Sequence, residues 1–427
     1  MQNDELHSLL HRNSADIDRA KAMSSWSKTR VILAGLLELP AILLMAGSSL
    51  LTMILCIPGL CLLVFEKSLF SSKQSLLRTK QSTGKQHAII TGGSSGIGLA
   101  VAQECVRQGM NVTLLARNME KLETAQKQLQ KEASGRVAVR VFSVDVSDRS
   151  ALQKIAPLVL NEEKEGTADS LADSTTHLFC CAGLAVPLEL TNLSLDQIHV
   201  MNATNLLGTI YTVRAFLSFI KRGTVVLTSS AGGQVGVYGY TAYSATKFGL
   251  RGFAESLHME LVGRPIHVQV AYPPDTDTPG YQTENKLKPK ACARVSEAAG
   301  LFTPSQYVLA TLSTSTTTLC VSPVLCFVFQ HSTVLLFSFF NSRVGTRMVS
   351  EATKANPPFA VWFGLDGWML ATLTAGMSPV SSLMGAVCQV SLAGLLRLVS
   401  LFYLNDFWNI VAEEEQEQEK AKVEATK

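Results

Sequence analysis

The sequence predicts an α/β fold, a Rossmann-type doubly wound parallel sheet, with N-terminal and C-terminal membrane segments. Between residues 86 and 279, short apolar runs rich in Val, Ile and Leu alternate with helical patterns. This alternation is typical of parallel strands joined by helices, and near-continuous apolar strands fit a sheet that is covered on both faces. Long apolar stretches on either side of this region predict the membrane segments.

The composition narrows the class of protein further. Of the 427 residues, 47% are apolar and 17% are charged, which favours association with a membrane. The net charge of +3 is too small to indicate a nucleic-acid partner. The nine cysteines form no C-x-x-C pair and no cluster with histidine at metal-ligand spacing. They are therefore interpreted as thiols in a reducing compartment, and neither a disulfide framework nor a metal site is expected.

The first apolar stretch follows a polar segment at residues 1–30. Residues 31–65 are almost wholly apolar, interrupted by Glu38 and Pro40, and a bilayer span needs only about 20 such residues. The stretch starts too late and runs too long for a signal peptide. A transmembrane anchor at 31–65 is therefore expected, and the alternative is a buried core helix.

The catalytic domain is predicted to occupy residues 86–310. Helical patterns fall near Gly96–Gln108, Glu120–Glu132, Leu193–Ile220 and Ala242–Val262, and a polar run at Asn161–Thr176 predicts a surface loop. Strands are expected at His87–Thr91, Asn111–Ala116, Val137–Asp145, His177–Cys181, Thr224–Ser229 and His267–Tyr272.

A glycine-rich segment follows the first predicted strand and opens a helix. It reads Thr91-Gly-Gly-Ser-Ser-Gly-Ile-Gly98. Glycines permit a tight turn and a close approach of the backbone to a pyrophosphate, and the helix N-terminus offers free N–H groups to phosphate. Its position between a strand and a helix favours a dinucleotide site over a plain turn. The residues expected to contact the cofactor here are Gly92, Ser94, Ser95, Gly96, Ile97 and Gly98.

The residues after the second strand indicate which cofactor is bound. An NAD site carries an acid about 20 residues beyond the glycines, whereas this chain has Arg117, with Lys121 one turn further on. A cation suits the 2′-phosphate of NADPH. Asp145 and Val146 end the third strand, where the adenine would lie. The alternative for Arg117 and Lys121 is a solvated surface pair.

Four polar residues form the candidate catalytic set. Tyr243 and Lys247 stand four residues apart on one helix face, where a cation would lower the pKa of the phenol and make it a better acid. Ser230 follows a strand end and could bond the reacting carbonyl oxygen. Asn205 lies in a helical pattern and could hold a water in a proton relay. Taken singly, each has an ordinary structural explanation, such as a buried tyrosine or a helix-capping serine.

T-G-x-x-x-G-x-G at 91–98, Asn205, Ser230 and Y-x-x-x-K at 243–247 together resemble the short-chain dehydrogenase/reductase family. The resemblance implies that Tyr243 is the acid, that Lys247 lowers its pKa and binds the nicotinamide ribose, that Ser230 orients the carbonyl and that Asn205 supports a water. One departure is Cys180-Cys181-Ala-Gly, where the family usually has Asn before Ala-Gly, so a contact near the adenine is expected to be weaker.

The stretch after the sixth strand resembles one branch of that family. Pro273-Pro-Asp-Thr-Asp-Thr-Pro279, the string at 239–247 and Leu365-Asp-Gly-Trp-Met-Leu370 are similar to reductases of sphingoid ketones. The resemblance implies a lipid substrate, 3-ketodihydrosphingosine, reduced with NADPH at the endoplasmic reticulum membrane with the catalytic domain facing the cytosol. Asp275 and Asp277 are tentative partners of the substrate ammonium. Their alternative role is to cap a turn.

Other readings stay open. The enzyme could instead reduce steroid or retinoid ketones, or the chain could be a non-catalytic nucleotide-binding membrane scaffold. The oligomeric state is not set by the sequence, and a homo-oligomer is one alternative.

The C-terminal part contains two further apolar regions. Residues 319–340 form a candidate extra membrane segment within a stretch, 312–347, that is absent from the related branch; it is either an insertion or an error in the sequence. Residues 365–404 form a hydrophobic membrane-associated region, and residues 413–427 a charged tail. Basic residues after residue 65 favour a cytosolic location of the catalytic side.

Overall fold

The computed structural model describes residues 86–161, 175–299, 301, 344–355, 357–376, 378–379 and 383–425. The predicted polar segment at 1–30, the anchor at 31–65 and the apolar segment at 319–340 lie outside these residues, as does most of the predicted polar loop.

A seven-stranded parallel sheet organises the described part of the chain. The strand order is β3-β2-β1-β4-β5-β6-β7, and all six neighbouring pairs are parallel. The strands are β1 Gln86–Thr91, β2 Asn111–Ala116, β3 Val139–Ser143, β4 Thr175–Cys180, β5 Gly223–Thr228, β6 Ile266–Tyr272 and β7 Ala360–Trp362. This confirms the predicted parallel doubly wound sheet. The order reverses between β1 and β4, and a crevice for a ligand opens at such a reversal.

The seventh strand extends the sheet beyond residue 310, where the sequence analysis placed the end of the catalytic domain. β7 pairs with β6 through Val270 and Ala360, and the carbonyl of Phe359 accepts from the amide of Val270 at 2.7 Å. β7 was not predicted, because it has only three residues and follows a long apolar stretch of the sequence.

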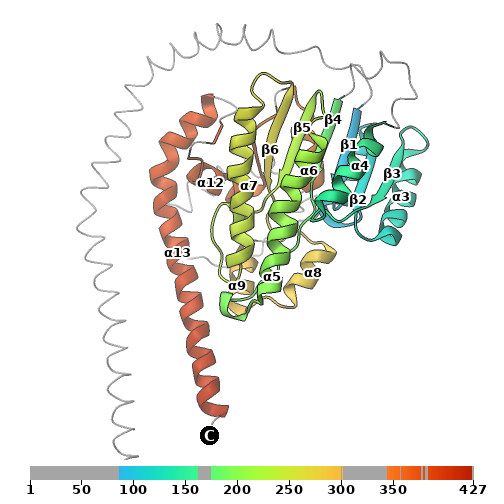
Figure 1. Cartoon of the computed structure of the whole chain (residues 1–427). Coiled ribbons are helices and arrows are strands. Elements are labelled where there is room, and N and C mark those ends of the chain that lie inside the picture. The colour runs from blue at the N-terminus through green and yellow to red at the C-terminus, as the bar shows by residue number, and fades with distance from the viewer. Residues whose placement is uncertain are drawn as a thin grey trace, which may run out of the picture. The chain divides into compact units, whose positions relative to one another are not determined.

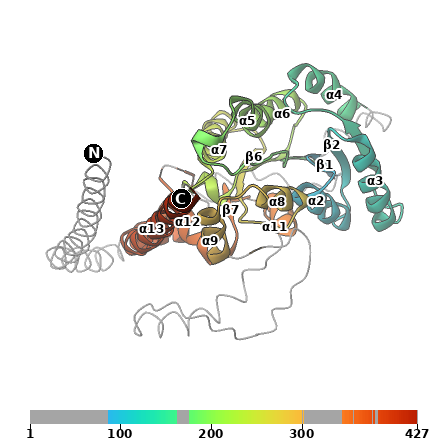
Figure 2. The same cartoon turned by 90° about the horizontal axis from the view of Figure 1, so that it is seen from below.

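Helices cover both faces of the sheet (Figure 2). They are α2 Gly96–Arg107, α3 Met119–Ala133, α4 Arg149–Asn161, α5 Leu195–Met201, α6 Gly208–Phe216, α7 Thr241–Glu260, α8 Pro279–Asn285, α9 Lys290–Ala299, α11 Val344–Ala352, α12 Gly364–Leu373 and α13 Leu383–Ala425. Apolar residues of α2, α3 and α11 pack with one face of the sheet, and those of α4, α6 and α7 pack with the other. The alternating strand faces thus bury two separate apolar layers.

The predicted helix at 193–220 contains an irregular turn. Between α5 and α6 the chain forms a π-helical turn at Asn202–Leu207. Such a turn widens the helix by one residue and often marks a functional position. Asn205 lies in this turn and is fully buried.

α11 belongs to the core of the sheet domain despite its late position in the sequence. A Cβ on Gly345 would lie 2.7 Å from the backbone carbon of Ala100 on α2, so only glycine permits this close helix approach. Val344, Met348 and Val349 are fully buried in the same layer.

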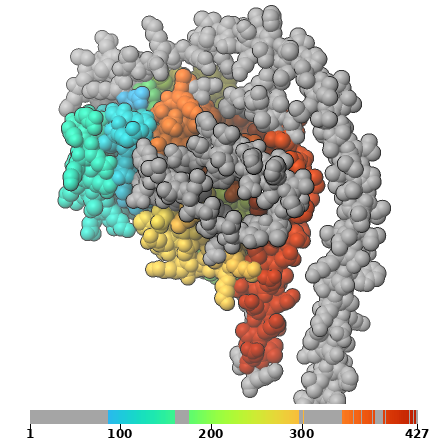
Figure 3. Space-filling view, turned by 180° about the vertical axis from the view of Figure 1, so that it is seen from behind, coloured from blue at the N-terminus to red at the C-terminus, as the bar shows by residue number. Residues whose placement is uncertain are grey.

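The C-terminal residues form α12 and the long helix α13, the red helix to the left of α12 and α7 in Figure 1. α13 continues into the predicted charged tail as far as Ala425. Arg294 of α9 bonds Glu413 at 3.0 Å, and Figure 3 shows the surfaces of these two helices in contact. Within the described ranges, no helix combines the length and the apolar character that crossing a membrane requires.

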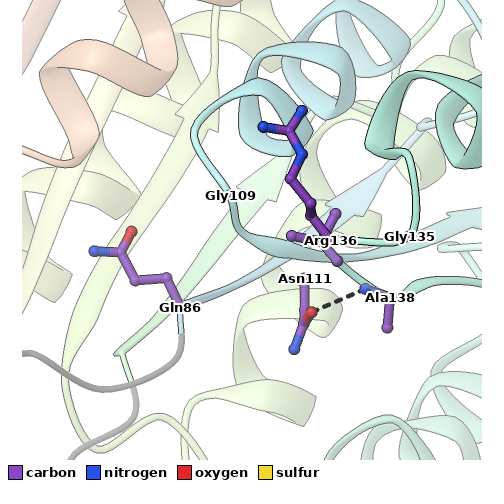
Figure 4. A pocket seen from close by; sticks show the side chains of 7 residues that line it. Gln86, Gly109, Asn111, Gly135, Arg136 and Ala138 are labelled. Atoms are coloured by element: carbon purple, nitrogen blue, oxygen red, sulfur yellow. Dashed lines mark hydrogen bonds between the residues drawn. The ribbon is translucent and has the colours of Figure 1, made fainter.

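A hollow of about 350 Å³ lies at the amino ends of the first two strands. Figure 4 shows Gln86, Asn111 and Arg136 around it, with Asn111 accepting a hydrogen bond from the amide of Ala138 at 3.0 Å. Because ligands of open parallel sheets bind at the carboxyl ends of the strands, this hollow is at the wrong edge for the candidate site.

Candidate active site

The glycine-rich loop leaves β1 at Thr91 and enters α2 at the reversal of strand order. A Cβ on Gly98 would lie 2.3 Å from the carbonyl oxygen of Gly92, and one on Gly92 would lie 2.9 Å from the backbone of Ala182. Gly92 and Gly96 also have φ angles of 66° and 55°, which favour glycine. The loop can therefore adopt this path only with glycine at these positions.

The N-terminus of α2 is open to a ligand. Ser95 caps the helix with an extended backbone, but its side chain makes no capping hydrogen bond, and the first turn holds no acidic residue. The first amides of a helix and its dipole attract phosphate. Ser95 is exposed, and Ser94 and Ile97 are half-buried beside this terminus, so the predicted cofactor residues come together here.

Arg117 and Asp145 face each other across the ends of β2 and β3. The guanidinium Nη1 lies 3.9 Å from the carboxylate Oδ2, with side-chain exposures of 66% and 40%. A pair this exposed contributes little, so the guanidinium is free to bind another anion. Lys121 lies in the first turn of α3 and is exposed; its backbone amide donates to the Asn118 side chain at 2.8 Å.

The end of β3 is held by its own hydrogen bonds. Burial raises the pKa of Asp145, but hydrogen bonds from the amide and hydroxyl of Ser147 outweigh it and leave the pKa below its ordinary value. Val146 is buried, and a Cβ on Gly208 would lie 2.8 Å from its side chain. This strand end is therefore a fixed wall beside the crevice.

Tyr243 and Lys247 lie on the face of α7 that is turned toward β5. The ammonium of Lys247 lies 5.5 Å from the centroid of the Tyr243 ring and donates to the carbonyl of Thr228 at 2.8 Å. Lys247 is 5% exposed, and burial lowers its pKa to about 8. The lysine therefore stands at the strand end with much of its hydration removed.

The acidity of Tyr243 differs from the expectation. Burial of the phenol raises its pKa, a hydrogen bond with Ser230 acts to lower it, and the charges of Glu284 and Asp275 raise it. The predicted lowering by Lys247 is not seen in this state of the protein, because desolvation of the phenol dominates and the Thr228 carbonyl holds the lysine ammonium. Ser230 also accepts from the amide of Gly232 at 3.1 Å, which fixes its side chain.

Asn205 is positioned by backbone rather than by another catalytic side chain. Its amide nitrogen donates to the carbonyl of Leu184 at 2.8 Å and to Thr246 Oγ1 at 3.2 Å, and its oxygen accepts from the amide of Leu184 at 2.9 Å. A Cβ on Gly183 would lie 3.3 Å from that oxygen and 3.5 Å from the Lys247 ammonium. Gly183 therefore opens the space between Asn205 and Lys247.

Cys181 occupies the position of the usual asparagine. Its sulfur accepts from Thr228 Oγ1 at 3.5 Å, and burial raises its pKa to about 11. Thr228 links this strand end to Lys247, so the departure from the family pattern lies beside the catalytic lysine.

Asp275 already has charged and polar partners within the chain, and Asp277 has a different partner. The Asp275 carboxylate lies 3.4 Å from the ammonium of Lys288 and accepts from the Tyr281 hydroxyl at 3.0 Å. Asp277 is exposed, and within the described residues its carboxylate accepts one hydrogen bond, from Gln282 at 3.3 Å.

A second phenol stands next to Tyr243. The rings of Tyr240 and Tyr243 are 5.5 Å apart, and the Tyr240 hydroxyl donates to Glu284. Burial raises the pKa of Glu284. Tyr240, Glu284 and Lys288 were not predicted as neighbours of the site. Tyr240 lies in the string at 239–247 that resembles the sphingoid-ketone branch, and this was its only signal in the sequence.

Comparisons with known proteins identify the family of this chain. The family described as short chain dehydrogenase matches residues 86–288. The chain is 37% identical to 3-ketodihydrosphingosine reductase of Bos taurus and to 3-dehydrosphinganine reductase of Danio rerio, each over 76% of this chain and 85% of the relative. A 3-dehydrosphinganine reductase of Arabidopsis thaliana is 33% identical over 78% of this chain and 87% of its own.

A solved structure is also similar. An alcohol dehydrogenase from Thermococcus sibiricus, complexed with 5-hydroxy-NADP, is 28% identical with a TM-score of 0.42, covering 50% of this chain and 88% of its own. The relatives and the matched region confirm the family resemblance drawn from the motifs, and the chain belongs to the short-chain dehydrogenase family.

Proposed function

We propose that this protein reduces the 3-keto group of 3-ketodihydrosphingosine to dihydrosphingosine with NADPH, a step of sphingolipid biosynthesis. The observation that carries the proposal is the assembly of Ser230, Tyr243 and Lys247 at the end of β5, next to the glycine-rich loop. The names of the relatives supply the substrate class.

The residues present fit a dinucleotide. The glycines leave a cradle that any Cβ would fill, and the N-terminus of α2 is open. Arg117 is exposed at the end of β2, where it would hold the 2′-phosphate that distinguishes NADPH from NADH. Gly183 keeps space free beside Lys247, which would bond the nicotinamide ribose. When bound, NADPH supplies the hydride.

The side chains of this chain manage the proton. Tyr243 stays protonated at neutral pH because burial raises its pKa, so its hydroxyl can donate to the ketone oxygen as the oxygen gains charge. Ser230, whose side chain is bonded to that phenol, steadies the same oxygen. Lys247 lies beside the ring and stabilises the phenolate that remains. Asn205 holds the Leu184 backbone and thereby one wall of the site.

The substrate ammonium next to the ketone needs a negative charge nearby, and we include Asp275 as its partner. Asp275 acts electrostatically on the Tyr243 phenol, which supports a position close to the reacting centre. Its pair with Lys288 already balances part of that charge. Asp277 has no such link to Tyr243 among the described contacts.

We further propose that the protein works at the endoplasmic reticulum membrane, with the catalytic domain facing the cytosol. The apolar stretches at 31–65, 319–340 and 365–404 and the basic residues that follow residue 65 support this arrangement. A substrate dissolved in lipid also favours an enzyme held at the membrane.

The test is NADPH oxidation by membranes that contain the full chain. We expect turnover with 3-ketodihydrosphingosine and none above background with ketosteroids or retinoid ketones, and Tyr243→Phe membranes serve as the control. Preference for a ketosteroid would favour the competing reductase. Binding of NADPH without turnover of any ketone would favour the non-catalytic scaffold.

A further inference from the structure

An apolar pocket lies between α13 and the loop that joins Ser230 to Tyr243. Its volume is about 370 Å³, within the range of about 300–1,000 Å³ for small-molecule sites. The loop contributes Gly236 and Tyr238. Helix α13 contributes Leu404, Phe407, Trp408, Val411 and Ala412, and Glu415 is the one charged residue of the lining. None of these lining residues belongs to the glycine-rich loop, and the loop wall lies in the segment that joins Ser230 to Tyr243.

The wall formed by α13 is regular. Leu404, Phe407, Trp408 and Val411 follow the spacing i, i+3, i+4, i+7, which places them on one face of the helix. Trp408 remains 67% exposed, and Leu404, Phe407 and Val411 remain partly exposed. A row of large apolar side chains that still faces solvent in part has apolar surface left to bury against a ligand.

The loop side of the pocket leads back to the catalytic tyrosine. Tyr238 donates a hydrogen bond to Glu189, and Leu188, the residue before Glu189, belongs to an apolar cluster that includes Tyr243 and the buried Met201. The ring of Tyr240, two residues beyond Tyr238, is tilted against the ring of Tyr243, with 5.5 Å between the ring centroids. These contacts connect the loop wall of the pocket to the residues that surround the reacting phenol.

We propose that this pocket binds the hydrocarbon chain of a single-chain lipid ketone while its head group lies at Tyr243. The inference rests on the proposed function and deepens it, because it assigns the recognition of the lipid tail to α13 and the loop at 236–238. The connection with the residues around Tyr243 favours this occupant over a second copy of the chain or a membrane surface. Burial of methylenes supplies the binding free energy, and chain length then becomes a determinant of specificity.

Gly236 offers a direct test. A Cβ at this position meets nothing within 4 Å, so Gly236→Leu should place its side chain in the pocket without a backbone clash. The purified full-length enzyme is assayed with the long-chain ketone and with a truncated analogue that keeps the 2-amino-3-keto head. We expect the long-to-short ratio of kcat/KM to fall about tenfold or more relative to the wild type, because a few lost methylene contacts suffice.

Two variants outside the pocket serve as controls. Phe402 is 76% exposed on α13 and does not line the pocket, and Gly252 also has open space at its Cβ. Phe402→Ala and Gly252→Leu should keep the wild-type ratio. An unchanged ratio in Gly236→Leu would overturn the proposal. An equally large fall of the ratio in Phe402→Ala would also overturn it, because the preference for long chains would then come from contact with the membrane or the lipid phase.

A second measurement does not depend on turnover. A long-chain alkylamine with bromine near the end of its chain should quench tryptophan fluorescence in the wild type, and Gly236→Leu and Trp408→Phe should remove most of that quenching. Equal quenching in all three proteins would contradict the pocket. If the wild type reduces neither ketone, the proposed function fails, whereas quenching that requires Trp408 and an open Gly236 would still support a site for a hydrocarbon chain.

Discussion

The side-chain amide of Asn205 bonds both the carbonyl and the amide of Leu184, at 2.8 and 2.9 Å. This double hydrogen bond joins the π-helical turn between α5 and α6 to the segment after β4, which borders the reacting centre. Asn205 is fully buried, and within the described residues its side chain is the partner of both backbone groups of Leu184.

Asn205→Ala should therefore lower stability as well as activity. Each buried backbone group left without a partner costs about 1–3 kcal/mol, and we expect the free energy of unfolding to fall by about 2–4 kcal/mol. The measurement is chemical denaturation followed by fluorescence. Asn202→Ala is the matched control, because Asn202 lies in the same turn and its side chain donates to the Ile198 carbonyl at 2.9 Å. A loss as large there would show that the turn, not the Leu184 contact, is responsible.

Tyr243→Phe should remove the proton donor and keep the ring. The loss of a positioned acid lowers the rate by about 10²–10⁴, and we expect this fall in kcat with saturating NADPH. Tyr240→Phe removes the neighbouring phenol, whose hydroxyl is already bonded to Glu284, and should lower kcat by less than about tenfold. If Tyr240→Phe lowered kcat more than Tyr243→Phe, Tyr240 and not Tyr243 would be the proton donor.

Lys247 should make stability depend on pH in the alkaline range. Its pKa falls from 10.5 to about 8 through burial, so between these values the unfolded chain holds a proton that the folded chain lacks. Stability contributed by this position therefore rises with pH across that window, by on the order of 3 kcal/mol at most. The stability of the wild type relative to Lys247→Met should increase from pH 7.5 to pH 10. Lys154→Met, at an exposed position of α4, should show no such trend; the same trend there would refute the assignment.

Arg117→Ala should raise the KM for NADPH and leave that for NADH little changed. A charge-assisted hydrogen bond contributes about 1.5–3 kcal/mol, which corresponds to a fall in the NADPH preference of about one to two decades. Steady-state kinetics with both cofactors measure it. Arg136→Ala, an exposed arginine at the amino edge of the sheet, should keep the wild-type preference. An unmoved ratio in Arg117→Ala would make Arg117 an ordinary surface residue.

Asn192 should carry no glycan if the catalytic domain faces the cytosol. Its sequon, Asn192-Leu-Ser194, ends an exposed turn at Leu190–Asn192, so the side chain would be available to the glycosylation machinery of the lumen. Asn111 and Asn202 lie in a strand and in the π-helical turn. We expect no change in gel mobility on glycosidase treatment. A shift that Asn192→Gln abolishes would place the domain in the lumen and contradict the proposed topology.

The sequence determined most of the fold because its strands are short and apolar and its turns are marked by glycine. β1, β2, β5 and β6 begin and end within one residue of their predicted limits. α4 was not predicted, since Pro157 lies inside it and interrupts the helical pattern. α11 and β7 were also missed, because a single sequence does not reveal that segments after a long apolar interruption return to the sheet.

In the candidate site, too, some features follow from the sequence and others only from the tertiary structure. Local spacing on one helix, at Tyr243 and Lys247, and the glycine pattern between a strand and a helix were sufficient to select those residues from the sequence. Tertiary structure alone decided that Asn205 bonds Leu184, that Lys288 pairs with Asp275, and that α13 reaches the loop beside Ser230. These contacts join residues far apart in the chain, and their distances depend on how the layers pack and not on any local pattern of residues.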